Sequence, residues 1–226
     1  MGSEAKRILM NEYKTLSKEP WVNIELDEAN ILSWEVALMV LNPDSLYYGG
    51  YFKAKMTFPT NYPYSPPTFR FIRSLIHPNI YKDGRLCISI LHAPGDDEMS
   101  GELASERWSP VQSVETVLLS ILSLLDDAEV SSPANVDAGV LLRRSPEEYK
   151  ELVKKDVEAS KRDIPEGFVM PTHESTRPLP PTKDKVDDDF WADSDEDFSF
   201  GGSDSDEDMA DDDEELENES DEDEDE

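Results

Sequence analysis

Apolar residues recur at helical spacing near the start of the chain, at Ala5, Ile8, Leu9, Tyr13 and Leu16. Ser3 precedes this pattern and can act as a helix cap, whereas Pro20 follows it and cannot continue a helix. We therefore expect the chain to open with a helix that is capped by Ser3 and ends before Pro20.

Four shorter segments then alternate apolar and polar residues, which is typical of strands with one buried face. Their apolar positions are Val22, Ile24 and Leu26, then Trp34, Val36, Leu38 and Val40, then Phe52, Ala54, Met56 and Phe58, and last Phe69 and Phe71. Short turns such as Asn42-Pro43-Asp44 and Gly49-Gly50 join neighbouring segments. The pattern predicts a four-stranded antiparallel meander whose second face helices must cover.

Helical spacing returns in the second half of the chain, at Val114, Val117, Leu118, Ile121, Leu122 and Leu125. This stripe predicts a central core helix. Ser145-Pro146-Glu147-Glu148 has the form of a capping box with proline at the first helical position, so we expect a last helix from there to about Lys161. The fold class is α+β.

Negative charge is concentrated at the C-terminal end. Residues 187–226 hold 24 acidic residues and no Lys or Arg, out of a net charge of -31. Such a segment has too little apolar surface to offset the entropy of ordering, so it predicts a disordered tail. We expect a folded domain over 1–169, a proline-containing linker over 170–186 and the tail over 187–226. The charge argues against nucleic acid as a partner and favours a basic protein.

Cysteine and histidine are scarce. A single cysteine, Cys87, excludes an internal disulfide and a multi-cysteine zinc site, and the three histidines add no ligand cluster, so we expect no metal. A protein without disulfides fits a reducing compartment, and we expect the nucleus and cytoplasm. No apolar run predicts a signal peptide or a membrane span.

Four motifs are similar to those of ubiquitin-conjugating enzymes and occur in that family's order. They read YYGGYF over 47–52, FPTNYPYSPP over 58–67, HPNIYKDGRLCISIL over 77–91 and WSPVQSV over 108–114. The resemblance covers about residues 5–165. It implies the ubiquitin-conjugating fold, and an enzyme that accepts ubiquitin from the activating enzyme as a thioester on Cys87 and passes it to lysines.

One departure from the family pattern narrows the resemblance. The usual spacing from the cysteine to the tryptophan is about eight residues, whereas Cys87 and Trp108 lie 21 residues apart because of an acidic insertion over about 92–107. Ser89 also stands where most members have Asp. These features resemble the endoplasmic-reticulum-degradation type and the cell-division-cycle protein 34 type. Segments 160–172 and 190–197 favour the fungal form of the second, which implies a role in the cell cycle.

The chemistry of the motif centres on Cys87 and Asn79. A lone cysteine is more often a small buried hydrophobe than a nucleophile, but Cys87 lies in a Gly-containing loop apart from the apolar stripes. The thiolate is the reactive form. Attack on a thioester builds negative charge on oxygen, which the amide of Asn79 can stabilise, or Asn79 can brace its loop, and both roles stay open. By resemblance, His77 and Pro78 are structural residues near the site.

The acceptor lysine must lose its proton, and nearby acids raise its pKa, so acids can help only by attracting the amine or accepting the proton. The residues expected to position this lysine are Ser89, Asp96, Asp97, Glu98 and Ser132. Glu102 and Glu106 could also attract it. A solvated surface insertion without such a role is the alternative.

The resemblance also implies partner surfaces. Lys6 and Arg7 would contact the activating enzyme, and a RING-type ligase would bind Tyr64, Ser109, Pro110 and Val111. The tail would bind a basic groove on a cullin. No cofactor is expected because the activating enzyme consumes the ATP, and the chain would be a monomer or self-associate weakly.

Two other functions compete with this interpretation. His77 and His92 near Cys87 would fit a cysteine protease, in which a histidine activates the thiol. A non-catalytic adaptor that binds basic partners through its acidic tail is the second. The presence of both Cys87 and Asn79 favours the conjugating enzyme over the adaptor.

Overall fold

The computed structural model describes residues 2–27, 29–95 and 101–176. The chain divides into two units at Pro178, and every described residue belongs to the first. The predicted tail and Asp96, Asp97 and Glu98 lie outside the described residues.

Four strands form one antiparallel sheet in the order β1-β2-β3-β4, as the alternation predicted. They are β1 (Val22–Leu26), β2 (Ser33–Met39), β3 (Tyr51–Thr57) and β4 (Thr68–Phe71). The buried positions Trp34, Val36 and Leu38 alternate along β2 because their side chains point to the covered face. The expected meander is confirmed.

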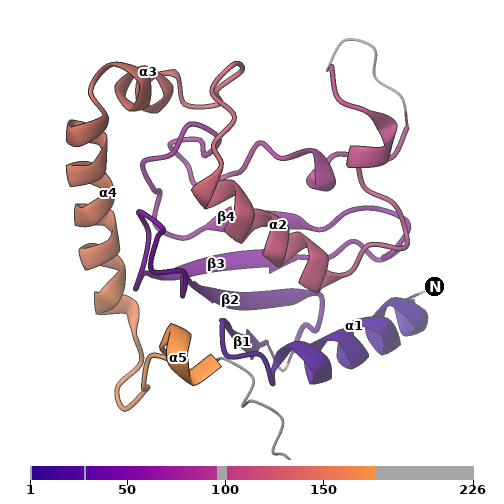
Figure 1. The fold of residues 1–226 in the computed structure, drawn as a ribbon. Helices are drawn as coiled ribbons and strands as arrows, with labels where there is room; N and C mark the ends of the chain where they lie inside the picture. Colours follow the sequence, from indigo (N-terminus) through magenta and orange to yellow (C-terminus); the bar gives the residue numbers. More distant parts are fainter. Residues whose placement is uncertain (1, 28, 96–100, 177–226) are drawn as a thin grey trace, which may run out of the picture. The chain divides into compact units, whose positions relative to one another are not determined.

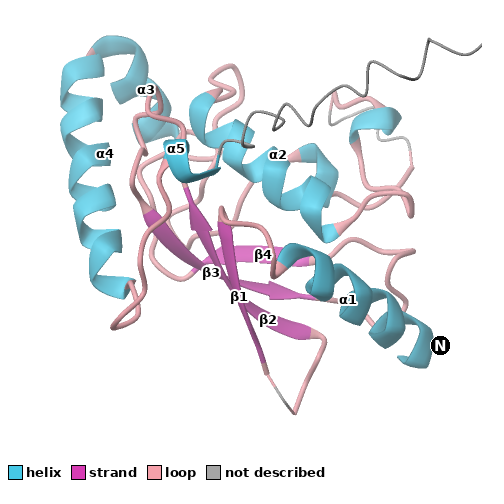
Figure 2. Cartoon of the chain, turned by 60° about the horizontal axis from the view of Figure 1, so that its bottom comes forward, coloured by secondary structure: helices cyan, strands magenta, loops and turns pink. Residues whose placement is uncertain are grey.

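Five α-helices surround this sheet in the described chain: α1 (Gly2–Leu16), α2 (Val114–Asp126), α3 (Val136–Arg144), α4 (Pro146–Ser160) and α5 (His173–Thr176). Helix α2 crosses one face of the sheet, while α1 and α4 lie at opposite ends (Figures 1 and 2). Short 3-10 helices cover Ser89–Leu91, Ala104–Glu106 and Lys161–Asp163.

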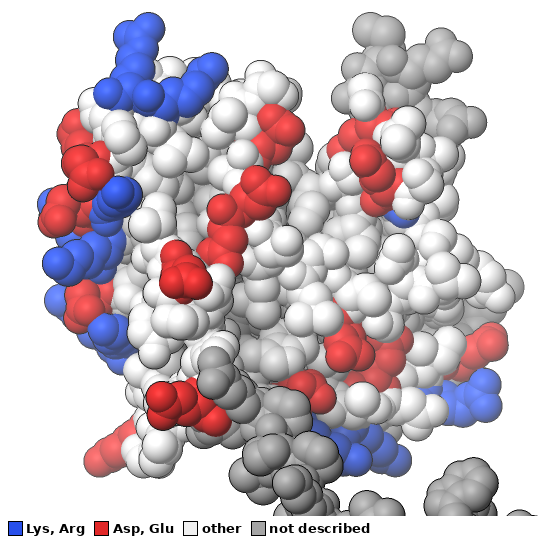
Figure 3. All heavy atoms as spheres, viewed as in Figure 1, with Lys and Arg blue, Asp and Glu red and all other residues white. Residues whose placement is uncertain are grey.

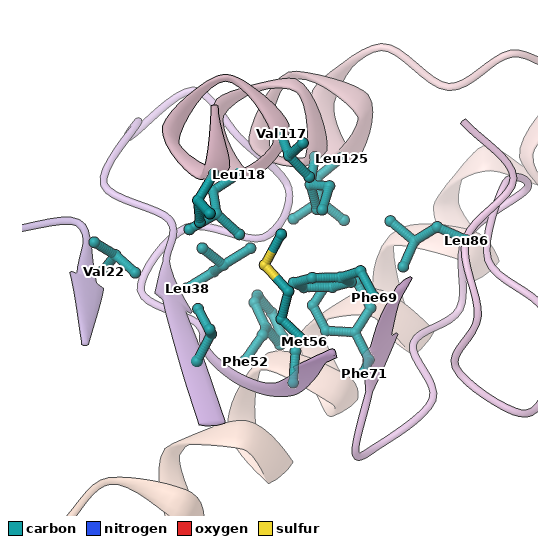
Figure 4. Packing of buried hydrophobic residues seen from close by; sticks show 14 of the residues in the cluster. Val22, Leu38, Phe52, Met56, Phe69, Phe71, Leu86, Val117, Leu118 and Leu125 are labelled. Atoms are coloured by element: carbon teal, nitrogen blue, oxygen red, sulfur yellow. The ribbon is translucent and has the colours of Figure 1, made fainter. Parts of the chain in front are cut away.

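The main core lies between α2 and the sheet. Val117, Leu118 and Leu125 of α2 point toward the strands (Figure 4). They meet Leu38, Phe52, Met56, Phe69 and Phe71. Each of these side chains is at least 95% buried. The predicted core helix is therefore confirmed.

The second face of the sheet is covered in part by a chain segment rather than by a long helix. Ile164, Phe168 and Met170 pack against Tyr51 and its neighbours, with the Phe168 and Tyr51 ring centroids 5.7 Å apart. The described structure thus continues past residue 169.

Two local expectations were wrong, and one helix was not predicted. Ser3 lies inside α1, which begins at Gly2, so it is not the cap. Ser145 makes no side-chain capping bond, although Pro146 does occupy the first position of α4. Helix α3, capped by the side chain of Asn135, was not predicted at all.

Candidate active site

Cys87 lies at the end of a loop that is fastened to the edge of the sheet. Isolated bridges join Arg70 to Arg85 and Ile80 to Leu86, and Phe71 N donates to Gly84 O over 2.9 Å. Gly84 has φ 88°, and a Cβ there would lie 2.2 Å from Phe71 O, so only glycine fits. The loop can therefore approach β4 closely and end at Cys87, whose side chain is partly buried.

Asn79 contributes to the site through both its backbone and its side chain. Its carbonyl accepts a 2.9 Å hydrogen bond from Cys87 N. Its side-chain Nδ2 donates to Glu129 O over 3.0 Å, and Oδ1 accepts from Glu129 N over 2.9 Å. Asn79 is 2% exposed, and it braces the loop between α2 and α3. An amide carries two N–H donors, and Glu129 O binds one of them.

His77 is a buried, neutral member of the same loop. Its Nδ1 accepts from Asn79 N over 3.0 Å, which puts the ring proton on Nε2. Burial lowers the pKa of His77 to about 4, and a backbone hydrogen bond with Leu124 only partly offsets this. Next to it, Pro78 O accepts from Asn135 N over 2.8 Å.

The geometry disfavours the protease interpretation. Within the described chain, no hydrogen bond joins Cys87 Sγ to His77 or His92. His77 is fully buried, and His92 Nδ1 lies 2.8 Å from the carboxylate of Glu102. Neither histidine is placed as the base of a Cys–His pair.

The acidic insertion is anchored at its base by Glu102. Ser89 Oγ donates to Glu102 Oε1 over 3.0 Å, His92 Nδ1 is within 2.8 Å, and Arg107 Nε lies 3.4 Å away. Burial would raise the pKa of Glu102, but hydrogen bonds from His92 and Ser89 and the charges of His92 and Arg107 hold it below the usual value. The position of Glu102 in the acidic insertion predicted only attraction of an amine, and no pattern in the sequence indicated this anchoring role.

Ser89 and Ser132 are the two described residues among those expected to position an acceptor lysine, and they make different contacts. Ser89 is bound to Glu102, whereas Ser132 is exposed in the loop that Asn79 braces through Glu129. In Figure 3, acidic side chains cover the described part of the insertion at the upper right and also run down the middle of the view, while Lys and Arg lie along the left edge, over α4, at the top left and at the lower right. No group of three potential metal ligands occurs in the described ranges.

Three of the four expected ligase-binding residues are exposed, on two loops that a hydrogen bond joins. Tyr64 is 64% and Val111 90% exposed, and Pro110 beside it is also exposed. Trp108 holds the loops together, because its Nε1 donates to Pro63 O over 2.8 Å. Ser109 is partly buried.

The expected activating-enzyme contacts, Lys6 and Arg7, are exposed on α1. None of the helices in the described residues has the length and apolar character needed to cross a membrane.

Comparison with known proteins agrees with this architecture. The family model for ubiquitin-conjugating enzymes matches residues 8–157. The chain is 52% identical over 204 residues to the ubiquitin-conjugating enzyme E2-34 kDa of Saccharomyces cerevisiae, covering 85% of this chain and 69% of the relative. It is 49% identical to enzyme E2 7 of Arabidopsis thaliana and 47% to enzyme E2 G2 of Homo sapiens. Each of these two matches covers 71% of this chain and 98% of the relative.

The match to the 34 kDa enzyme confirms the resemblance inferred from the acidic insertion and tail. The family model and the relatives together cover the α1–α4 fold and the Cys87 loop. The chain therefore belongs to the ubiquitin-conjugating enzymes, which are ubiquitin transferases.

Proposed function

We propose that Cys87 carries ubiquitin as a thioester and transfers it to lysines of a substrate or of another ubiquitin, together with a cullin-RING ligase. The observation that supports this most is the backbone hydrogen bond from Cys87 N to Asn79 O. The only cysteine of the chain ends a loop whose neighbouring asparagine is fixed by two side-chain bonds to Glu129.

The first step is attack by the Cys87 thiolate on the thioester of the activating enzyme. A bond forms from Cys87 Sγ to the ubiquitin carbonyl carbon, and the activating enzyme's thiolate leaves. In the second step a lysine amine attacks that carbon, the amide bond forms, and the Cys87 thiolate leaves. The amine loses its proton before or during attack.

Asn79 would stabilise the oxyanion that forms in both steps. Because Nδ2 is held by Glu129 O, its second N–H has a fixed direction, which avoids reorganisation during the reaction. Since one donor of this kind contributes about 10² to 10³ in rate, Asn79→Ala should slow discharge to lysine by that factor.

The test is incubation with activating enzyme, ubiquitin and ATP. The wild type should form an adduct that reductant removes, and Cys87→Ser should form none while keeping its fold. A reductant-sensitive adduct on Cys87→Ser would contradict the nucleophile assignment. Failure of the wild type to charge would favour the alternative of a non-catalytic acidic adaptor.

The acidic tail would bind a basic groove on the cullin. Its 24 acids would speed association by about 10-fold to 10³-fold over a neutral encounter, and salt would screen the attraction. Truncation after Val186 should lower the association rate and leave Cys87 charging unchanged. Stopped-flow binding across a salt series checks this, and equal rates at low salt would contradict it.

We also propose action in the nucleus and cytoplasm and a role in the cell cycle. The single cysteine supports a reducing compartment. Cell fractionation and depletion during division would test these two points.

A further inference from the structure

Glu12 is a carboxylate placed where α1 meets the start of α2. Its Oε2 accepts a 2.6 Å hydrogen bond from Val114 N, and its Oε1 accepts a 2.8 Å hydrogen bond from Tyr62 Oη. Val114 is the first residue of α2, whose N–H has no partner within its own helix. The side chain of Glu12 therefore accepts hydrogen bonds from both the first N–H of α2 and a buried tyrosine hydroxyl.

The link continues from Tyr62 into the loops that carry the exposed partner residues. Tyr62 is 2% exposed, and its ring centroid lies 5.9 Å from that of Trp108. Trp108 in turn donates to Pro63 O. One carboxylate thus connects α1, the Tyr62 loop and the Trp108 loop that leads into α2.

The residues expected to contact partners lie on these same segments. Lys6 and Arg7 are on α1, Tyr64 follows Tyr62 by two residues, and Pro110 and Val111 follow Trp108. Within the described structure, the hydrogen bonds of Glu12 reach none of residues 77–92 around Cys87. The network thus belongs to the partner surface rather than to the reacting centre.

A carboxylate is a costly choice at this position if its only role is to hold the core together. Burial raises the pKa of Glu12, and the hydrogen bonds from Val114 and Tyr62 offset this only in part. Neither donor is charged, so no opposite charge offsets the desolvation. What the carboxylate provides, and a neutral side chain cannot, is two acceptors aimed at donors on two different segments.

We propose that Glu12 is a positioning residue that fixes α1, the Tyr64 loop and the Pro110–Val111 loop relative to one another, so that a RING-type ligase meets a preformed surface. This inference rests on the proposed function for the location of the ligase contact. A preformed surface avoids the cost of ordering loops on binding, so its loss should weaken binding more than chemistry.

The test compares Glu12→Gln with the wild type in discharge of charged enzyme to free lysine, with and without a RING ligase. Gln retains one acceptor and presents an amide NH₂ to the other donor. We expect ligase-free discharge within about 2-fold of wild type, KM for the ligase raised by about 10-fold, and kcat little changed. Tyr62→Phe keeps the ring and removes one bond, so it should change KM in the same direction by less.

The matched control is Glu4→Gln, the same change at an exposed position of α1, which should leave all three values unchanged. An unchanged KM in Glu12→Gln, or an equal fall in ligase-free and ligase-stimulated rates, would overturn the proposal in favour of a purely structural role. Val111→Ala distinguishes an error in the proposed ligase surface from an error in the role of Glu12. If Val111→Ala also has a wild-type KM for the ligase, the proposed ligase surface is wrong, and the proposal that Glu12 positions that surface fails with it.

Discussion

Glu12 and Glu102 are two partly buried glutamates that each join separate segments of the chain, but their hydrogen-bond donors differ in charge. Glu12 accepts from a tyrosine hydroxyl and a backbone N–H. Glu102 accepts from a serine hydroxyl, while the ring of His92 and the guanidinium of Arg107 approach the same carboxylate. The two sites differ both in the charge of their neighbours and in how deeply the carboxylate is buried.

Their pKa values move in opposite directions. Burial dominates at Glu12 and raises its pKa, although the bonds from Val114 and Tyr62 oppose the change. Burial acts in the same sense at Glu102, but the hydrogen bonds from His92 and Ser89 and the nearby positive charges outweigh it, so the pKa falls. The sign of each shift therefore depends on the balance between burial, which is deeper at Glu12, and the hydrogen bonds and nearby charges that favour the ionised form, which prevail at Glu102.

This difference suits the two locations. Glu102 stays ionised and holds the base of the insertion beside the segment that follows Cys87. Glu12 lies on the segments expected to contact partners, where its hydrogen bonds join α1 to two loops.

The largest expected effect is on stability when the charged cluster is broken. Glu102→Gln removes the negative charge that Ser89, His92 and Arg107 share, and we expect a loss of about 3 to 4 kcal/mol in the free energy of unfolding at pH 7. Urea denaturation measures it. Glu106→Gln is the control, because Glu106 lies in the same insertion but is exposed. Equal losses in the two variants would contradict the anchoring role of Glu102.

His77 sharpens the comparison because burial dominates its pKa shift. Its folded pKa of about 4 lies below the usual 6.5, so between these values the unfolded chain binds more protons than the folded one. Stability should be present in full above pH 6.5 and fall by about 3 kcal/mol as pH drops to 4.

Subtracting the pH profile of His77→Gln from that of wild type isolates this contribution. Gln keeps an acceptor for Asn79 N, so the loop bond survives. Identical pH profiles for the two proteins would show that burial does not suppress protonation of His77.

The two glutamates should also give pH slopes of opposite sign, with smaller amplitude. The raised pKa of Glu12 means that the folded state binds more protons above pH 4.5, so wild type loses stability relative to Glu12→Gln as pH rises through the folded pKa. The lowered pKa of Glu102 means the reverse: its contribution is present above pH 4.5 and is lost as pH falls through the folded pKa. Difference profiles from urea titrations between pH 3 and pH 8 would measure both signs, and slopes of the same sign would break the comparison.

Periodicity predicted the sheet and the central helix because one face of each is buried. Along β2, Trp34, Val36 and Leu38 point to the core while Glu35 does not, and this alternation is visible in the sequence. Helix α3 was not predicted because it is only nine residues long and its first residue, Val136, is 62% exposed, so it has no long apolar stripe. The cap at Asn135 was the one available signal.

Contacts distant in sequence could not be predicted in the same way. The motif identified Asn79 and Cys87, but the partner of Asn79 is the backbone of Glu129, 50 residues away. Ser89 precedes the insertion and Glu102 lies within it, 13 residues further on, so no local periodicity could predict that they pair. The capping role expected for Ser145 was wrong because this residue also ends α3, where its N–H donates to Leu141 O.

The smallest expected effect concerns Ser89, whose hydroxyl is the neutral member of the Glu102 cluster. Ser89→Ala removes one hydrogen bond to a carboxylate that keeps His92 and Arg107, so the loss should be about 1 kcal/mol, at the lower end for a charged acceptor. Ser105→Ala is the control, because Ser105 is an exposed serine of the same insertion.

A double-mutant cycle of Ser89→Ala with Glu102→Gln should give a coupling energy of about 1 kcal/mol, because Ser89 has little left to lose once the carboxylate is gone. Losing the Ser89 bond should also raise the pKa of Glu102, which would move the acid-side loss of stability to higher pH. If the two substitutions have additive effects on stability, and if Ser89→Ala does not change the pH at which stability is lost on the acid side, then charge alone anchors the insertion.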